Sequence, residues 1–350
     1  MPNRGPEFAA TEIEAMSTDI EAGCGGGAFS GVGDGIVVTF KDGTTVRVEK
    51  GTSLLDLSER FAKGVPFPII AAKVDNDLKE LTYRLEDDCT VEFLDMATED
   101  GMRIYHRSVV SVLVRAAKEV LPGCRVSIEH SLGNGLYGEI YWERPLTERD
   151  IEKIERRMFE IVAENAPFVK ESVPKEEAIE LFRKEGQDDK VRLLKYRTSP
   201  TVNVYSCGWF HDYCYGYMVP STGYLRTFRL RYYLPGFILE LPRKEDPLII
   251  PEYVEQGKLA NIYFEAEKWG QVLGVMDVAS LNDAISRGEA GDLIRVAEAF
   301  HEKKIARIAD MIAENRDRLR VILIAGPSSS GKTTFAQRLS VQLRVNGLKP

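Results

Sequence analysis

Long apolar runs are missing from this chain. No stretch approaches the roughly 18 consecutive apolar residues that a membrane-spanning helix needs, so we expect no membrane partner. The N-terminus lacks a basic start followed by an apolar core, so no secretory signal is predicted. Histidine (4 residues) and cysteine (5 residues) are scarce. The odd number and wide spacing of the cysteines argue against a disulfide framework, and a reducing cytoplasm is the expected location.

Positive charge is also in deficit. The formal net charge is −8, which argues against a surface that coats nucleic acid generally but leaves room for a local basic patch. We expect no DNA partner. A hydrophobic content of 44% and a charged content of 29% are ordinary for a soluble globular protein of two or three domains.

The N-terminal third divides into a tail and a small domain. Residues 1–34 have little apolar periodicity and end in a glycine cluster, which predicts a disordered tail. Apolar residues then alternate over 36–40 and 44–48 around Asp42-Gly43, the signature of a β-hairpin. A short helix carrying Leu54, Leu57 and Phe61, capped by Thr52 or Ser53, and strands at 69–74 and 91–94 complete a pattern that fits a β-grasp module.

The middle of the chain, residues 98–246, reads as α+β. Helices are predicted over 103–120, after Thr147 and after Pro174, with strands at 126–129, at 137–142 and within 201–241, and helices covering one face of a sheet. Residues 247–319 change to helical spacing and predict a connector. There is no internal repeat.

One motif near the C-terminal end points directly to chemistry. The segment 326–333 matches G-x-x-x-x-G-K-[ST], the Walker A phosphate-binding loop. The apolar run 321–325 before it predicts a buried parallel strand, and Phe335, Leu339 and Leu343 after it share one face of a predicted helix. The predicted nucleotide-binding residues are Gly326, Pro327, Ser328, Ser329, Ser330, Gly331, Lys332, Thr333 and Thr334.

Each residue type in this loop has a physical role. The two glycines permit backbone geometry in which N–H groups converge on phosphate oxygens, with the helix N-terminus adding positive potential. Lys332 is predicted to reach the β- and γ-phosphates of ATP, and the Thr333 hydroxyl to ligate Mg²⁺. The less favoured interpretation is a serine–glycine turn beside a chance lysine.

Other polar clusters are weaker signals. Cys207, His211 and Cys214 could suggest zinc, but a structural zinc needs four ligands and His130 is distant in sequence, so ordinary hairpin residues are favoured. His106 and His301 are predicted to be surface or packed residues. The aromatic residues between 205 and 217 favour packing over base stacking.

Three segments resemble known families. Residues 325–334 resemble the phosphate loop of the uridine kinase and phosphoribulokinase group. Residues 36–95 resemble a TGS domain, a β-grasp module of threonyl-tRNA synthetases and some regulatory GTPases. Residues 98–245 resemble the second additional domain of threonyl- and alanyl-tRNA synthetases, through Leu146–Ile151, Ile154–Met158 and Val219–Gly223. The order of these modules is similar to that of bacterial multidomain nucleoside kinases.

The resemblance to the synthetase domain implies a zinc site that this chain lacks. The positions of the H-x-x-x-H and C-x-x-x-H ligands fall on Arg107, Ser111, Cys214 and Met218, so three of four ligands are absent. An arginine has no lone pair to offer a metal. We therefore expect neither zinc nor metal-dependent editing.

The resemblance implies an α+β multidomain fold. Its parts are a tail (1–34), a TGS β-grasp domain (35–97), a synthetase-editing-like domain (98–246), a helical connector (247–319) and the first βα unit of an α/β P-loop kinase (320–350). The implied function is an ATP- and Mg²⁺-dependent nucleoside kinase, a phosphotransferase of the uridine kinase type. Its nucleoside acceptor, and a catalytic base expected beyond Pro350, are not identified.

We expect this 350-residue chain to be inactive as a kinase, because family members continue past the loop. Two alternatives remain open. One is an RNA- or ligand-binding regulatory module with an inert kinase remnant, in which the TGS and synthetase-like domains contact RNA. The other is a TGS-containing GTPase.

Overall fold

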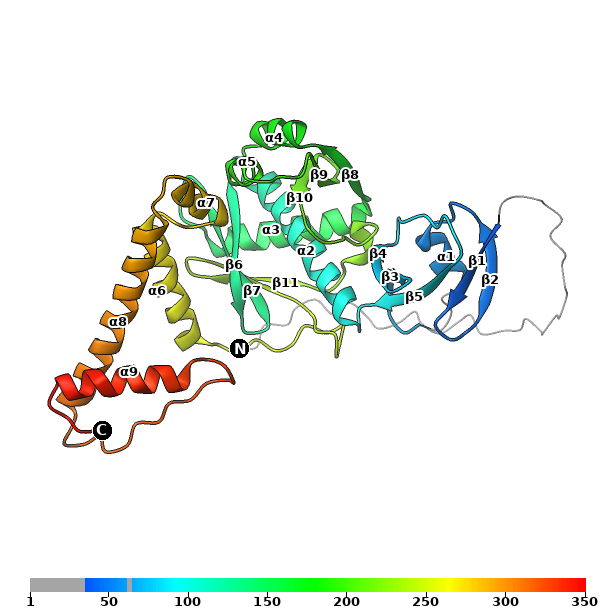
Figure 1. The fold of residues 1–350 in the computed structure, drawn as a ribbon. Coiled ribbons are helices and arrows are strands. Elements are labelled where there is room, and N and C mark those ends of the chain that lie inside the picture. Colours follow the sequence, from blue (N-terminus) through cyan, green and yellow to red (C-terminus); the bar gives the residue numbers. More distant parts are fainter. Residues whose placement is uncertain (1–34, 62–64) are drawn as a thin grey trace, which may run out of the picture.

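The computed structural model describes residues 35–61 and 65–350. The predicted tail, with Cys24, lies outside them. Figure 1 shows a β-grasp unit at one end of the described chain and the C-terminal helices at the other, with a mixed unit between. In the part of the chain that the structure describes, no helix is long and apolar enough to cross a membrane.

The β-grasp unit is a five-stranded sheet with one helix packed on it. Strands β1 (Gly35–Phe40) and β2 (Thr45–Glu49) form the predicted hairpin, and β1 also pairs in parallel with β5 (Cys89–Asp95). Strands β3 (Ile69–Val74) and β4 (Asp77–Glu80) complete the order β2-β1-β5-β3-β4. Helix α1 (Leu54–Phe61) buries Leu54 and Leu57 against this sheet. Ser53 caps it, accepting a hydrogen bond from the Asp56 amide at 3.1 Å.

Helix α2 (Glu99–Val120) joins this unit to the rest of the molecule. Thr98 caps it by accepting from the Gly101 amide at 3.2 Å. Gly101 is required here, because a Cβ at this position would lie 2.0 Å from the carbonyl oxygen of Asp95. The helix therefore begins in close contact with the end of β5, and its direction is fixed relative to the β-grasp sheet.

The middle unit holds two sheets rather than the single one predicted. The three-stranded sheet has the order β10-β9-β8, and the four-stranded sheet the order β11-β12-β7-β6. Helix α3 (Glu148–Glu164) packs beside α2. The other elements are β6 (Arg125–Leu132), β7 (Gly135–Tyr141), β8 (Phe168–Pro174), α4 (Lys175–Lys184), α5 (Asp188–Lys195), β9 (Thr201–Cys207), β10 (Phe210–Tyr213), a 3-10 turn (Thr222–Tyr224), β11 (Arg229–Tyr233) and β12 (Gly236–Glu240).

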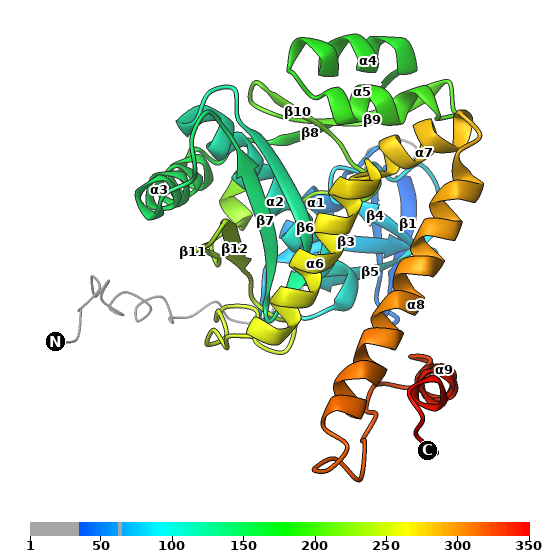
Figure 2. The same cartoon turned by 90° about the vertical axis from the view of Figure 1, so that its left-hand side faces the viewer.

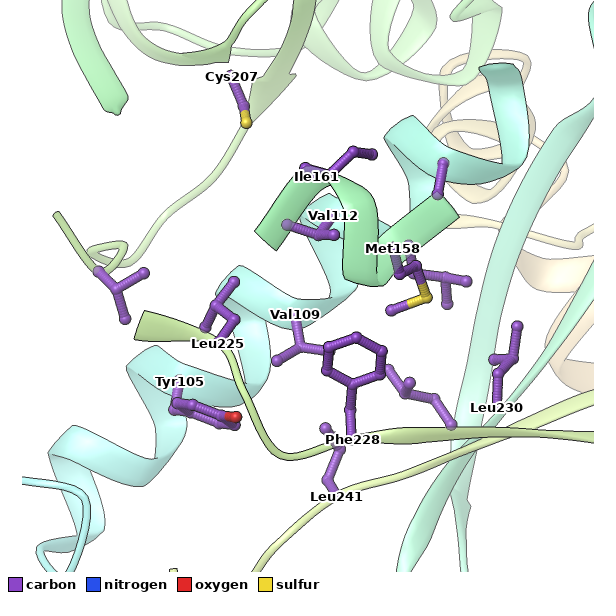
Figure 3. Packing of buried hydrophobic residues seen from close by; sticks show 14 of the residues in the cluster. Tyr105, Val109, Val112, Met158, Ile161, Cys207, Leu225, Phe228, Leu230 and Leu241 are labelled. Carbon is purple, nitrogen blue, oxygen red and sulfur yellow. The ribbon is translucent and has the colours of Figure 1, made fainter. Parts of the chain in front are cut away.

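One apolar core runs through both units. It contains Ile70 and Leu94 from the β-grasp sheet together with Val109 and Leu113 of α2, all nearly inaccessible to solvent. Figure 3 shows its middle, where residues of α2, α3 and the segment 225–241 surround Phe228. Because burial of this apolar surface is the main favourable term in folding, the two units are expected to unfold together.

The predicted connector is helical, with α6 (Gly257–Leu273), α7 (Val278–Ser286) and α8 (Ala290–Glu314). Helix α6 packs on the four-stranded sheet through Ala260 and Phe264. Trp269 of α6 meets Phe300 of α8, with ring centroids 3.5 Å apart, and Figure 2 shows the two helices side by side.

The sequence prediction fails at the segment before the phosphate loop. Residues 321–325 form no strand, and Leu323 is 89% exposed. A parallel strand is stable only with partners on its edges and helices on its faces, and the described chain supplies no such partner here. The P-loop kinase unit predicted for 320–350 is therefore not supported. Strands β4 and β8 and helix α5 were not predicted; α5 carries no strong apolar periodicity, with only Val191 and Leu194 buried.

The N-terminus of α3 is stabilised by a buried carboxylate. Asp150 accepts two hydrogen bonds from the guanidinium of Arg144, at 2.8 and 2.9 Å, and further bonds from the hydroxyl and amide of Thr147. Thr147 and Asp150 also form a capping box. The bonds from Arg144, followed by those from Thr147, hold the pKa of Asp150 well below its ordinary value despite burial.

Asp150→Asn is expected to destabilise the protein by about 1–3 kcal/mol at pH 7. Because the folded-state pKa is depressed, the contribution is fully present above the unfolded-state value near 4 and is lost as the pH falls toward the folded-state value. Urea unfolding at pH 7 and pH 3 should show a smaller difference at pH 3. Asp292→Asn, on an exposed carboxylate of α8, is the matched control; an equal effect of both substitutions would contradict this reading.

Candidate functional site

Arg107 and Met218, two of the four positions at which the resemblance implies zinc ligands, lie where α2 contacts segment 214–218. Arg107 of α2 donates a hydrogen bond to the carbonyl of Tyr217 at 2.7 Å. A Cβ at residue 216 would lie 2.1 Å from the carbon of the same guanidinium, so a glycine is needed there. The Ser108 hydroxyl donates to the sulfur of Met218 at 3.5 Å. A guanidinium thus occupies the space between α2 and segment 214–218.

Cys214 is the residue of this set whose side chain ordinarily ligates zinc, and burial raises the pKa of its thiol to about 12. Arg107 has no lone pair to offer a metal, and Ser111 is a buried hydroxyl on α2. The donor set around residues 107–111 and 214–218 therefore does not suit zinc.

The second possible zinc cluster is dispersed. Cys207 is buried and accepts from the Arg115 guanidinium at 3.5 Å. His211 pairs through Nδ1 with the Glu185 carboxylate at 2.5 Å, and His130 stacks on Tyr263. Within residues 35–61 and 65–350, no group of three or more His, Cys, Asp or Glu side chains is arranged to hold a metal.

The remaining histidines and aromatic residues were predicted mostly as packing. His106 binds the carbonyl of Pro242 at 2.9 Å, and burial lowers its pKa. His301 of α8 lies 3.2 Å from the Arg338 guanidinium. Of the aromatic residues between 205 and 217, Tyr205 and Phe210 are buried as expected. Tyr215 is 82% exposed, which the packing prediction did not anticipate.

A hydrogen-bond network joins the β-grasp unit to the middle unit. Glu80 of the β-grasp strand β4 accepts from Lys170 of β8 at 3.1 Å and from the Tyr205 hydroxyl at 2.7 Å. The Lys170 ammonium also lies 4.8 Å from the centre of the Tyr217 ring. Sequence reasoning missed this network, because Glu80 and Tyr205 are 125 residues apart and only the tertiary fold joins them.

A cavity of about 930 Å³ lies where the β-grasp unit meets the middle unit. Its lining includes Phe67 and Met96 from one side and Tyr105, Asn165 and Arg226 from the other. The Tyr105 hydroxyl is fixed by donating to the Thr227 carbonyl and accepting from its amide. Arg226 is exposed and donates from Nε to the carbonyl of Gly223, so much of its guanidinium faces solvent.

The phosphate loop lies far along the chain, before α9 (Lys332–Val345). Gly331 has φ 77°, the left-handed conformation that opens the helix, and Ser329 has φ 60°. Residues 326–331 are exposed, and the Lys332 ammonium donates to the carbonyl of Pro327 at 2.5 Å. Helix α9 buries Leu339 and Leu343 against Ile305 and Ala309 of α8. The helix and loop are therefore positioned by the connector rather than by a sheet.

Comparison with known proteins confirms the β-grasp assignment. Residues 36–95 match the TGS domain model. The chain is 34% identical over 194 residues to the threonine–tRNA ligase of Symbiobacterium thermophilum, covering 55% of this chain and 30% of the relative. It is 32% identical over 196 residues to that of Desulforamulus reducens, covering 56% and 31%, and 33% identical over 195 residues to that of Methylococcus capsulatus. This chain spans about a third of the length of these relatives.

These relatives correct the functional prediction from the sequence. Membership in the uridine kinase and phosphoribulokinase group is wrong, because the matched proteins are tRNA ligases. The relatives therefore do not support the predicted nucleoside kinase activity, its phosphotransferase class or its nucleoside partner. The two alternatives, a regulatory module with an inert kinase remnant and a TGS-containing GTPase, do not match these relatives either.

The protein is expected to purify without stoichiometric zinc, because Arg107, Ser111 and Met218 replace three ligands. Elemental analysis of the protein and of Cys214→Ala should give the same low zinc content. One zinc per chain, lost in Cys214→Ala but retained in a Cys89→Ala control, would contradict this expectation.

Proposed function

We propose that residues 36–245 form a unit that contacts tRNA. The observation that carries the proposal is the similarity to threonine–tRNA ligases, whose name states that they act on tRNA, together with the matched TGS domain. The continuous core through both units supports it, because it holds the two units as one surface. Ligation of threonine is not assigned to any residue of this chain.

The cavity between the units is our candidate for the contact. Arg226 has no carboxylate partner among the residues that the structure describes, so its charge is available for a phosphate. The net charge of −8 means that such contacts must be local rather than spread over the surface. Hydrolytic editing through a metal is not part of this proposal, because the ligand positions do not suit a metal.

We also propose that residues 326–334 bind the phosphates of ATP with Mg²⁺. The supporting observation is the left-handed Gly331 at the start of α9, where the first amides of the helix have no intrahelical partner. The Lys332 ammonium, which donates to the Pro327 carbonyl, would donate to a phosphate oxygen instead. The Thr333 hydroxyl would ligate Mg²⁺. We also propose that the chain divides into domains at residues 35–97, 98–246, 247–319 and 320–350.

A fluorescently labelled tRNA should bind the protein with an affinity that falls as salt rises, because phosphate contacts release counterions. Arg226→Gln should weaken binding several-fold and lower the slope of log affinity against log salt by about 1. Arg295→Gln, on an exposed arginine of α8, is the matched control. Absence of tRNA binding at low salt would remove the proposal.

Lys332→Ala should weaken binding of ATP with Mg²⁺ by about 10- to 100-fold, since a charged hydrogen-bond donor to phosphate is lost. Isothermal calorimetry measures the affinity, and Lys349→Ala, on an exposed lysine beyond α9, is the control. Equal affinities of the wild type and Lys332→Ala would exclude the loop as a nucleotide site.

A further inference from the structure

A second, smaller pocket lies at the junction of the middle unit and the connector. It has a volume of about 310 Å³ and is lined by residues of α5 and the segment after it, of β10 and the segment after it, and of α7, including Arg197, Tyr213, Tyr215, Val278 and Asn282. Figure 1 shows α5 and α7 next to each other at this junction. None of these residues takes part in the sites described above.

Two polar atoms beside this pocket, Nε of Arg197 and the hydroxyl oxygen of Tyr213, are buried and have no hydrogen-bond partner among residues 35–61 and 65–350. Buried polar groups are nearly always paired, and an unpaired one costs free energy that the fold must offset. Both groups can donate a hydrogen bond. Burial raises the pKa of Tyr213 to about 12, so its hydroxyl keeps its proton at neutral pH.

Arg197 forms no ion pair with a carboxylate in the described part of the chain. Its guanidinium lies beside two tyrosines that contact each other, 5.6 Å from the ring centre of Tyr213 and 5.3 Å from that of Tyr215. Nη1 donates to the Tyr215 hydroxyl at 2.9 Å. Asp283 is bound to Tyr196 and Arg192. The charge of Arg197 is therefore available to an anion in the pocket.

Tyr215 adds an aromatic face to this cation. Its side chain is 82% exposed, although its ring packs edge-on against Tyr213 with centroids 5.2 Å apart. Exposed tyrosines beside an arginine are the elements with which proteins stack bases and hold phosphates. Val278 contributes an apolar wall. The pocket thus offers a stacking surface and one positive charge.

We propose that this pocket binds one nucleotide unit, with its base on Tyr215 and its phosphate or base carbonyl oxygens accepting from the Arg197 guanidinium. Its volume is at the lower end of ligand pockets and suits a single nucleotide rather than an extended strand. The unit comes either from a free nucleoside monophosphate or from an unpaired residue of RNA. The RNA source rests on the proposed tRNA contact, whereas the free source does not.

The first arm of the test uses AMP and UMP with the Lys332→Ala protein, so that the phosphate loop does not contribute. Calorimetry should show binding that Tyr215→Ala weakens about 5- to 100-fold, the range for loss of one base–aromatic stack. Arg197→Gln should weaken it about tenfold. Tyr215→Phe, which keeps the ring, should retain affinity within about threefold. Tyr83→Ala, which removes another exposed tyrosine under a lysine, should change nothing.

The second arm measures labelled tRNA against the same variants in the otherwise wild-type protein, with thermal unfolding to verify that each variant is folded. Loss of tRNA affinity in Tyr215→Ala, rescued in Tyr215→Phe, assigns the pocket to an RNA nucleotide. Loss of AMP or UMP affinity alone assigns it to a free nucleotide. If tRNA does not bind the wild type at all, the proposed function fails while the mononucleotide arm still decides the pocket. Unchanged affinities of Tyr215→Ala and Arg197→Gln in both arms would overturn the inference.

Discussion

The burial of helix α2 is the constraint on which the described structure depends. One end of the helix begins against β5 of the β-grasp sheet, with Gly101 allowing the contact, and its apolar face continues into the core of the middle unit. Because Val109, Leu113 and their neighbours are shared by both units, neither can move without exposing apolar surface of the other. The Glu80 pair with Lys170 and Tyr205 then fixes the same junction by polar contacts.

The resemblance to a synthetase domain implies a metal site where α2 meets the segment before β11, and the side chains at this contact do not provide one. Arg107 places a cation there that donates to the Tyr217 carbonyl, and burial raises the pKa of Cys214 to about 12. The contact is instead made by hydrogen bonds between the two segments, from Arg107 to Tyr217 and from the Val219 amide to the Ser108 hydroxyl.

The phosphate loop illustrates the limit of a local motif. Its glycines and the helix after it form as the sequence predicts, since φ of Gly331 and the capping of α9 depend on nearby residues only. The run 321–325 has the composition of a buried strand but remains exposed, because a strand also requires neighbours that composition cannot supply. A phosphate-loop motif therefore predicts local backbone geometry, but it does not predict the sheet that would surround it.

Local patterns in the sequence determined the hairpin at 36–48 and the helices after Thr147 and Pro174, because alternation and capping act over a few residues. The helix predicted over 103–120 forms as well, but it begins earlier, at Glu99. The TGS assignment came from resemblance and is confirmed. The spacing of Cys207, His211 and Cys214, with no fourth ligand nearby in the sequence, already argued against a structural zinc site there. Only the tertiary structure decided that the middle unit has two sheets, that Glu80 meets Tyr205 and that Cys207, His211 and Cys214 separate. The tertiary structure also decided that Arg197 lies beside two tyrosines at an open pocket. These contacts join elements that are distant in sequence, so packing selects them and local conformational preference does not.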